Sequence, residues 1–279
     1  MYKYSPRNHR KSYRWFRKYS ESKLGSMIAP EEFRHIKKLY HYTSFKTGII
    51  ILLSKMLRMS PLSNMNDINE SYRMLYSSGC DISDVESEMK RYFQSSFTID
   101  DDFLPGFALP AMWGHYADKG KGVCLVFDMH KLLKRFRQEI FFHGAISYYD
   151  GPYDASIIVE DNPQEYCIKH YQNIFFSKSA DWAYEREYRL VCRSEDDLVE
   201  IDISDCIIAI VVNQLDDISR YDTFLNSPKY RSLVCQAKKQ EVPVLVLGNR
   251  ILSPDITLTD CYGNNWYTTD KEIKYKLDI

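Results

Sequence analysis

The apolar residues of this chain come in short segments, and the shortness of those segments most limits its fold. The longest uninterrupted apolar runs are 49–53 and 206–212. A membrane-spanning helix needs about 20 predominantly apolar residues, so we expect none here. Many segments of strand length follow one another, with few helices between them. This order predicts an α+β fold rather than a regular alternation of strands and helices.

Composition fits a globular protein. Hydrophobic residues make up 44% and charged residues 27% of the 279 positions, which excludes a disordered or collagen-like chain. No internal repeat or low-complexity linker interrupts 39–279, so we expect one compact domain there. The seven cysteines never form a C-x-x-C pair. We therefore expect neither a disulfide framework nor a thiolate zinc site, and we expect the protein to be cytoplasmic.

Local patterns place the individual elements. Strands are predicted at 39–43, 57–60, 122–127, 145–149, from 185 onward, and at 198–203, 207–212 and 242–247. Helices are predicted at 85–93, 130–136 and 163–176. Ser44 is placed to cap a further helix. The residues expected to cover one side of that helix are Ile49, Ile50, Leu52, Leu53 and Met56.

Charge is distributed unevenly between the N-terminal segment and the rest. Residues 1–38 hold eleven Lys/Arg and three acids, which gives +8 and leaves 26 minus 35, or −9, for the remainder. Aromatic residues interleave with basic residues at helical spacing, so a basic helical arm is predicted over 1–38. The basic residues are Arg7, Arg10, Lys11, Arg14, Arg17 and Lys18. The arm could bind nucleic acid, an acidic protein or a membrane surface, could dock on the acidic body, or could be an organellar transit peptide.

The first of three polar, aromatic clusters lies in the predicted strand 39–43. Strand alternation puts His41 and Thr43 on one face, and Tyr40 and Tyr42 on the other. His41 and Thr43 could bind one ligand together. Alternatively, the strand is half-buried and a neighbouring carbonyl satisfies the histidine.

The second cluster occupies 111–118. Trp113, His115 and Tyr116 offer stacking surfaces and hydrogen bonds that suit a planar ring ligand. The competing explanation is packing, because a Trp-Gly pair before a turn often fills a core.

The third cluster occupies 181–190, where Glu185, Glu187 and Arg189 alternate along a predicted strand and should share one face. On a solvated face they would form ordinary ion pairs. In a cleft, neighbouring carboxylates perturb each other's pKa and can stabilise a cation or activate a nucleophile. The chain has no metalloprotease, P-loop, Rossmann or nucleophile-elbow motif, and the spacing of its histidines does not indicate a metal site.

Four motifs in order resemble a bacterial family, domain of unknown function 2971, over about residues 39–215. They are Leu39-Tyr40-His41-Tyr42-Thr43-Ser44; Ser63-Asn64-Met65-Asn66-Asp67 with Glu70; Met112-Trp113-Gly114-His115-Tyr116-Ala117 with Gly122-Val123; and Trp182-x-Tyr184-Glu185-x-Glu187-x-Arg189. Lys55 stands where many relatives have glycine. The turn before the second strand is therefore expected to differ.

That family in turn resembles the ADP-ribosyltransferase superfamily. The resemblance implies a single α+β domain with a split, mostly antiparallel sheet flanked by short helices, NAD as substrate and no metal. It matches His41 to the histidine on the adenosine-side ribose, Thr43 to its small partner, and Glu187 to the catalytic glutamate. Trp113 or Tyr116 would lie under nicotinamide, and Glu185 would be the first carboxylate of a Glu-x-Glu pair. Further expected substrate-binding residues are His115, Arg189, Asn66 and Asp67.

Two functions follow as expectations. The first is an enzyme that uses NAD to modify a macromolecule, or hydrolyses NAD, as a toxin or phage-defence effector. The second is a non-catalytic nucleotide- or nucleic-acid-binding module with a basic arm. In the enzyme His41, Tyr116 and Glu187 should line one cleft, whereas in the module Glu185 and Glu187 could lie on a solvated face.

Overall fold

A computed structural model describes residues 37–62, 81–101, 104–136, 140–149, 162–213, 227–249, 256–260 and 265–268. Several predicted features lie outside these residues, namely the basic arm with Arg7, Arg10, Lys11, Arg14, Arg17 and Lys18, and the loop residues Asn66 and Asp67. Their predicted roles stay predictions.

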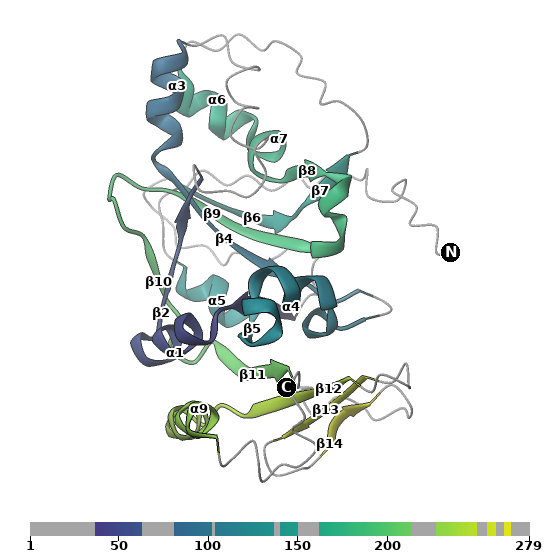
Figure 1. Ribbon diagram of the computed structural model, residues 1–279. Helices are drawn as coiled ribbons and strands as arrows, with labels where there is room; N and C mark the ends of the chain where they lie inside the picture. The colour runs from purple at the N-terminus through teal and green to yellow at the C-terminus, as the bar shows by residue number, and fades with distance from the viewer. Residues whose placement is uncertain are drawn as a thin grey trace. The chain divides into compact units, whose positions relative to one another are not determined.

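The described residues form two compact units, and each unit is assembled from segments that are distant in the sequence (Figure 1). Unit 1 consists of the described parts of 58–97 and 136–201, and unit 2 of the described parts of 37–57, 98–135 and 202–268. Both combine helices with mostly antiparallel strands. The predicted α+β class with a mostly antiparallel sheet is confirmed.

Unit 2 contains six strands side by side, in the order β14-β13-β12-β11-β5-β1. Their bounds are β1 Lys38–Thr43, β5 Val123–Asp128, β11 Ile207–Asn213, β12 Val244–Asn249, β13 Ile256–Asp260 and β14 Asn265–Thr268. Neighbours are antiparallel except β11 and β12, which are parallel. Strands β1 and β5 pair without a bulge from Lys38 opposite Asp128 to Thr43 opposite Val123. The short strand β2 (Met56–Arg58) starts in unit 2.

The helices of unit 2 are α1 Phe45–Ser54, α4 Pro110–Tyr116, α5 Met129–Arg135 and α9 Pro228–Lys239, with 3₁₀ turns η4 Gly106–Ala108 and η5 Asp118–Gly120. Ser44 caps α1 as predicted, because its Oγ accepts a hydrogen bond from Thr47 N at 3.1 Å. The predicted apolar side is partly wrong. Ile50 and Leu53 are 54% and 55% exposed, because the helix buries the face that contains Gly48 and Ile51.

Two glycines allow close packing in unit 2. A Cβ on Gly48 would lie 2.3 Å from Val123 Cγ2, so a bare backbone lets α1 approach β5. A Cβ on Gly122 would lie 2.2 Å from the carbonyl oxygen of Thr43. Both residues therefore fix the corner where β1, α1 and β5 meet.

In unit 1, strand β9 lies between β4 and β6. The short strand β3 pairs with β4. Strands β7 and β8 form a separate parallel pair. The bounds are β3 Ser60–Pro61, β4 Tyr92–Thr98, β6 Ile140–Ala145, β7 Ser147–Tyr149, β8 Ser177–Ser179, β9 Glu187–Arg193 and β10 Glu200–Asp202. The helices are α3 Ile82–Met89, α6 Pro163–Lys169, α7 Tyr171–Phe175 and the 3₁₀ helix η6 Ala180–Glu185. A buried cluster that includes Tyr92, Phe142, Tyr166 and Phe175 forms its core.

Three boundaries in unit 1 differ from the sequence prediction. The helix predicted at 85–93 ends at Met89, because Tyr92 already belongs to β4. The helix predicted at 163–176 is interrupted at His170. The strand predicted from 185 starts at 187, because 180–185 forms η6. Among the helices in the described ranges, none is both long and apolar enough to cross a membrane.

Candidate functional site

Four charged side chains of unit 1 gather where β8, η6 and β9 meet. They are Lys178 on β8, Glu185 at the end of η6, and Glu187 and Arg189 on β9. All four are between 1% and 5% exposed. The interpretation of Glu185 and Glu187 as ion pairs on a solvated face is therefore wrong. We call these four residues the buried charge cluster.

Arginine and lysine together enclose the Glu187 carboxylate. Arg189 donates from Nε to Oε1 at 2.5 Å and from Nη2 to Oε2 at 2.8 Å, and its Nη1 donates to the carbonyl of Phe175 at 2.9 Å. Lys178 Nζ donates to Glu185 Oε2 at 2.6 Å and to Glu187 Oε2 at 3.3 Å. Two cations thus face two carboxylates, and the formal charge of the cluster is zero. Buried charges require such pairing.

A left-handed turn brings the two glutamates to the same lysine. Arg186, between them, adopts φ 47°, which ends η6 and starts β9 in a new direction. The predicted strand alternation therefore applies to Glu187 and Arg189 but not to Glu185. Lys178 Nζ also lies 4.6 Å from the ring centroid of Trp182, a cation–π distance.

The electrostatics keep Glu187 ionised. Burial by itself would raise the pKa of Glu187, but the charge and hydrogen bonds of Arg189, together with Lys178, lower that pKa from 4.5 to about 2. Burial likewise opposes the charge of Lys178, yet Glu187 and Glu185 raise its pKa above 10.5. Tyr148 completes the surroundings, because its hydroxyl accepts a hydrogen bond from Glu187 N at 2.9 Å. Burial, and then the Glu187 charge, raise the pKa of Tyr148.

Such a carboxylate has one clear chemical capability. A fixed negative charge in a poorly solvated site stabilises positive charge that develops on a bound group. Both oxygens of Glu187 accept from Arg189. A substrate cation would therefore share Glu187 with Arg189 and Lys178. Lys178 and Tyr148 were not predicted from the sequence. A lysine between two serines carries no signal of burial.

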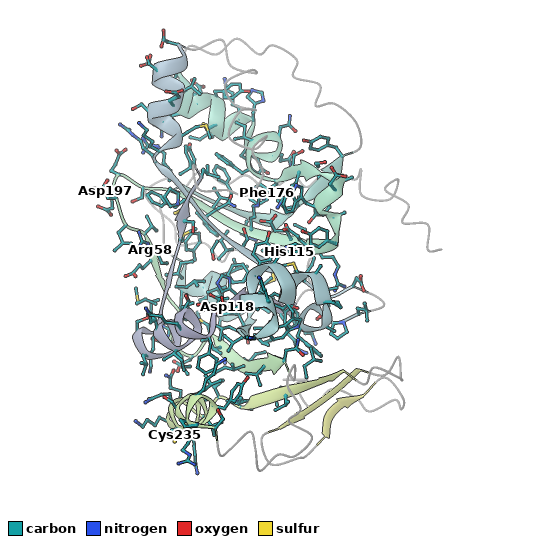
Figure 2. The ribbon with its side chains drawn as sticks, in the orientation of Figure 1. Arg58, His115, Asp118, Phe176, Asp197 and Cys235 are labelled. Atoms are coloured by element: carbon teal, nitrogen blue, oxygen red, sulfur yellow. The ribbon has the colours of Figure 1, made fainter. Side chains whose placement is uncertain are left out.

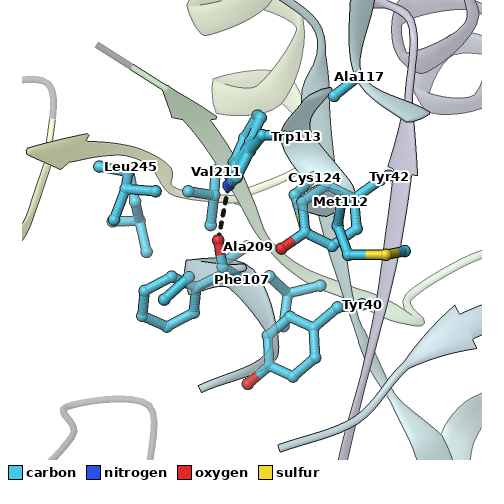
Figure 3. Close-up of a cluster of buried hydrophobic side chains, with 13 residues drawn as sticks. Tyr40, Tyr42, Phe107, Met112, Trp113, Ala117, Cys124, Ala209, Val211 and Leu245 are labelled. Carbon is cyan, nitrogen blue, oxygen red and sulfur yellow. Dashed lines mark hydrogen bonds between the residues drawn. The ribbon is translucent and has the colours of Figure 1, made fainter. Parts of the chain in front are cut away.

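The aromatic cluster predicted at 111–118 divides into a buried and an exposed part. Trp113 is 3% exposed, donates from Nε1 to the carbonyl of Phe107 at 2.8 Å, and makes a T-shaped contact with Tyr42 (Figure 3). Trp113 thus packs in the core, as the alternative interpretation holds. His115, labelled in Figure 2, is exposed on α4, and Tyr116 is half-buried. These two rings lie 6.3 Å apart.

The alternation predicted for β1 is confirmed. Tyr40 and Tyr42 belong to the same buried cluster as Trp113, whereas His41 and Thr43 do not (Figure 3). His41 is half-buried and Thr43 is buried.

The predicted site residues divide between the two units. Glu185, Glu187 and Arg189 lie together in unit 1, whereas His41, Thr43, Trp113, His115 and Tyr116 lie in unit 2. Their convergence on one pocket stays a prediction. Within the described ranges, no group of three or more His, Cys, Asp or Glu side chains is arranged to hold a metal ion.

A family model described as "Protein of unknown function (DUF2971)" matches residues 112–190. Over this segment the match supports the predicted resemblance to the DUF2971 family. The matched segment runs from α4 into β9 and so contains Trp113, His115 and Tyr116 as well as Glu185, Glu187 and Arg189. His41 and Thr43 lie outside it. No curated protein and no solved structure matches the chain.

Proposed function

We propose that this DUF2971 chain is an ADP-ribosyltransferase-like enzyme that breaks the bond between nicotinamide and ribose in NAD. Nicotinamide leaves with the bonding electron pair, and positive charge builds on the ribose. A nucleophile of a macromolecule, or water, then forms the new bond to the ribose and releases a proton. The overall reaction needs no oxidant and no metal.

The observation that supports this function is the ionised, buried Glu187. Glu187 is 4% exposed, and Arg189 and Lys178 hold its pKa near 2, so it carries a fixed negative charge at neutral pH. A preorganised carboxylate stabilises an oxocarbenium-like transition state more than it stabilises neutral ribose in the ground state. Glu187 is the residue that the ADP-ribosyltransferase resemblance matches to the catalytic glutamate. His41, on β1 of unit 2, is the residue that it matches to ribose binding.

One observation favours a structural role for Glu187, as the second candidate, a non-catalytic nucleotide- or nucleic-acid-binding module, would have it. Arg189 occupies both oxygens of Glu187 with short hydrogen bonds, and Lys178 adds a third. A carboxylate enclosed in this way also serves as a structural ion pair. The two candidates differ in whether Glu187 is needed for turnover or for folding alone.

Nicotinamide release separates the candidates. The full chain is incubated with NAD alone and with NAD plus a bacterial lysate, and nicotinamide is measured by chromatography. The test variant is Glu187→Gln, which keeps the shape of the side chain but removes its charge. Glu88→Gln is the matched control in the same unit, because Arg193 binds the Glu88 carboxylate in a similar fork, at 2.7 Å from Nε and 3.3 Å from Nη2.

We expect the wild type and Glu88→Gln to release nicotinamide, and Glu187→Gln to be slower by about 10²- to 10³-fold, the usual effect of losing one electrostatic stabiliser. His41→Ala should raise KM more than it lowers kcat, because its proposed role is binding. If the wild type releases no nicotinamide under either condition, or if folded Glu187→Gln retains full turnover, the binding module replaces the enzyme.

A further inference from the structure

Helices α1 and α9 of unit 2 are joined at both of their ends (Figure 1). Near their starts, the rings of Phe45 and Tyr230 make a T-shaped contact with centroids 5.8 Å apart. After the last turn of α9, Gln240 Nε2 donates a hydrogen bond to the carbonyl of Leu52, near the end of α1, at 2.6 Å. The solvent-facing sides of the two helices therefore belong to one surface.

The turn η5 lies against the starts of both helices. Asp118 Oδ2 accepts a hydrogen bond from Phe45 N at 3.4 Å, and Lys229 Nζ donates one to the carbonyl of Lys121 at 2.9 Å. Three segments of unit 2 thus meet here, namely 44–55, 117–122 and 227–241. We call the exposed residues of these three segments the α1–α9 surface.

The α1–α9 surface is strongly positive. Its three segments hold eight Lys/Arg and two acids, Asp118 and Glu241, so their formal charge is 8 minus 2, or +6, in a chain of net charge −1. The eight cations, all exposed, are Lys46, Lys55, Lys119, Lys121, Lys229, Arg231, Lys238 and Lys239. Among the described residues, no carboxylate pairs with Lys46, Lys119 or Lys121. A cluster of this charge attracts anionic partners from solution.

Two exposed aliphatic side chains lie within this positive surface. Ile50 and Leu53 are 54% and 55% exposed, one turn apart on the face of α1 that also holds Lys46. Lys55 follows them, and its φ of 57° keeps the left-handed turn that glycine favours, so the lysine adds a charge without the expected change of turn. The surface therefore combines cations with apolar groups that gain from leaving water.

Charge argues against two occupants that the chain itself could supply. The segment 1–38 carries +8, and a second copy docked on the same surface would bring another +6, so like charges would repel each other. Nucleic acid supplies negative charge, but its phosphates gain nothing from the two aliphatic side chains. The rings of Phe45 and Tyr230 are half-buried and already contact Lys229 Nζ, which lies 4.3 Å and 5.2 Å from their centroids. They are therefore poorly placed to stack on bases.

An anionic bilayer supplies both kinds of contact. Its headgroup phosphates pair with lysine and arginine, and the boundary between headgroups and acyl chains accepts aliphatic side chains. We propose that the α1–α9 surface binds reversibly to a membrane that contains anionic phospholipids, with Ile50 and Leu53 entering this boundary between the cations. None of its residues is assigned a role in NAD cleavage, so the membrane contact goes beyond the proposed function and does not depend on it.

Co-sedimentation of the full chain with lipid vesicles tests the proposal. One set of vesicles is phosphatidylcholine alone, and the other contains equal amounts of phosphatidylcholine and phosphatidylglycerol. We expect the chain to bind the anionic vesicles at least tenfold more tightly. This binding should weaken as salt rises to physiological strength, because salt screens exposed charges. Equal binding to both sets of vesicles, or binding to neither, would overturn the proposal.

Charge reversal separates this surface from the basic segment 1–38. The test variant carries Lys46→Glu and Lys121→Glu. The matched control carries Lys131→Glu and Lys134→Glu, which are equally exposed but lie on α5, beyond the opposite end of β5 from α1. We expect the test variant to bind anionic vesicles at least tenfold more weakly, and the control to bind them like the wild type. If both variants lose the same affinity, or neither loses any, the α1–α9 surface is not the binding site.

The apolar contact is tested by Leu53→Ser, with Leu198→Ser as control. The two leucines are 55% and 50% exposed, but Leu198 lies in unit 1 next to Asp197. We expect Leu53→Ser to bind anionic vesicles several-fold more weakly and Leu198→Ser to bind them like the wild type, both with the wild-type urea midpoint of unfolding. If Leu53→Ser keeps full affinity, or if charge reversal weakens binding to a short DNA duplex more than to vesicles, the partner is a polyanion and not a bilayer.

Discussion

Replacing Glu187 with glutamine removes one of four charges from the interior of unit 1. Arg189 and Lys178 would then face Glu185 alone, and the cluster would carry a buried charge of +1. Removing one partner of a buried ion pair costs about 3–5 kcal/mol, because the remaining charge is neither hydrated nor paired.

The pKa of Glu187 gives a second estimate of the free-energy cost of removing its charge. The shift from 4.5 to about 2 corresponds to about 3 kcal/mol at about 1.4 kcal/mol per pKa unit. Since the folded-state pKa is the lower one, this stabilisation is fully present above pH 4.5 and is lost as the pH falls toward 2. The wild type should therefore lose stability over that range. The stability of Glu187→Gln should lack this pH dependence, because the amide does not titrate.

Urea unfolding combined with hydrogen exchange of the amides in β6 and β9 measures the effect within unit 1. We expect Glu187→Gln to be about 3 kcal/mol less stable than the wild type at pH 7, and the difference to shrink below pH 4.5. The control Glu88→Gln should cost less, because Arg193 also pairs with Glu195 at 2.7 Å. A difference below 1 kcal/mol at pH 7, or one that does not change between pH 5 and 3, would refute the electrostatic account of the cluster.

Two further predictions concern single residues. Burial lowers the pKa of His143 from 6.5 to about 4, so about 3 kcal/mol of stability, present above pH 6.5, should be lost as the pH falls to 4. In urea titrations at several pH values, His143→Phe should not show this loss. A variant with the pH profile of the wild type would contradict the prediction. Gly48→Ala should destabilise the protein by about 1–3 kcal/mol, because the Cβ of the new alanine would lie 2.3 Å from Val123 Cγ2. A thermal midpoint equal to that of the wild type would show that Val123 moves aside without cost.

Strands with apolar residues could be predicted from the sequence, because their pattern reflects burial directly. The segments 122–127 and 207–212 match β5 and β11 to within one residue at each end. Strand β4 was missed because three of its residues, Gln94, Ser95 and Thr98, are polar and nonetheless buried. A polar residue in a strand suggests an exposed face, so the burial of these side chains could not be inferred from their residue type.

The candidate site shows the same limit more sharply. The sequence indicated that Glu185, Glu187 and Arg189 belong together, since they stand close along the chain. It could not indicate that all three are buried, because burial depends on Lys178 and on the left-handed turn at Arg186. Lys178 could be recognised only after β8 had been placed beside η6 and β9.

The buried charge cluster also limits how a catalytic role of Glu187 can be demonstrated. The contacts that keep its carboxylate ionised, from Arg189 and Lys178, are the contacts that stabilise unit 1. A loss of NAD cleavage in Glu187→Gln therefore means catalysis only if β9 still protects its amides as in the wild type. If activity and amide protection fall together in proportion, the carboxylate acts through the fold. If activity falls while protection remains, the negative charge acts on the substrate, because the two effects have separated within one side chain.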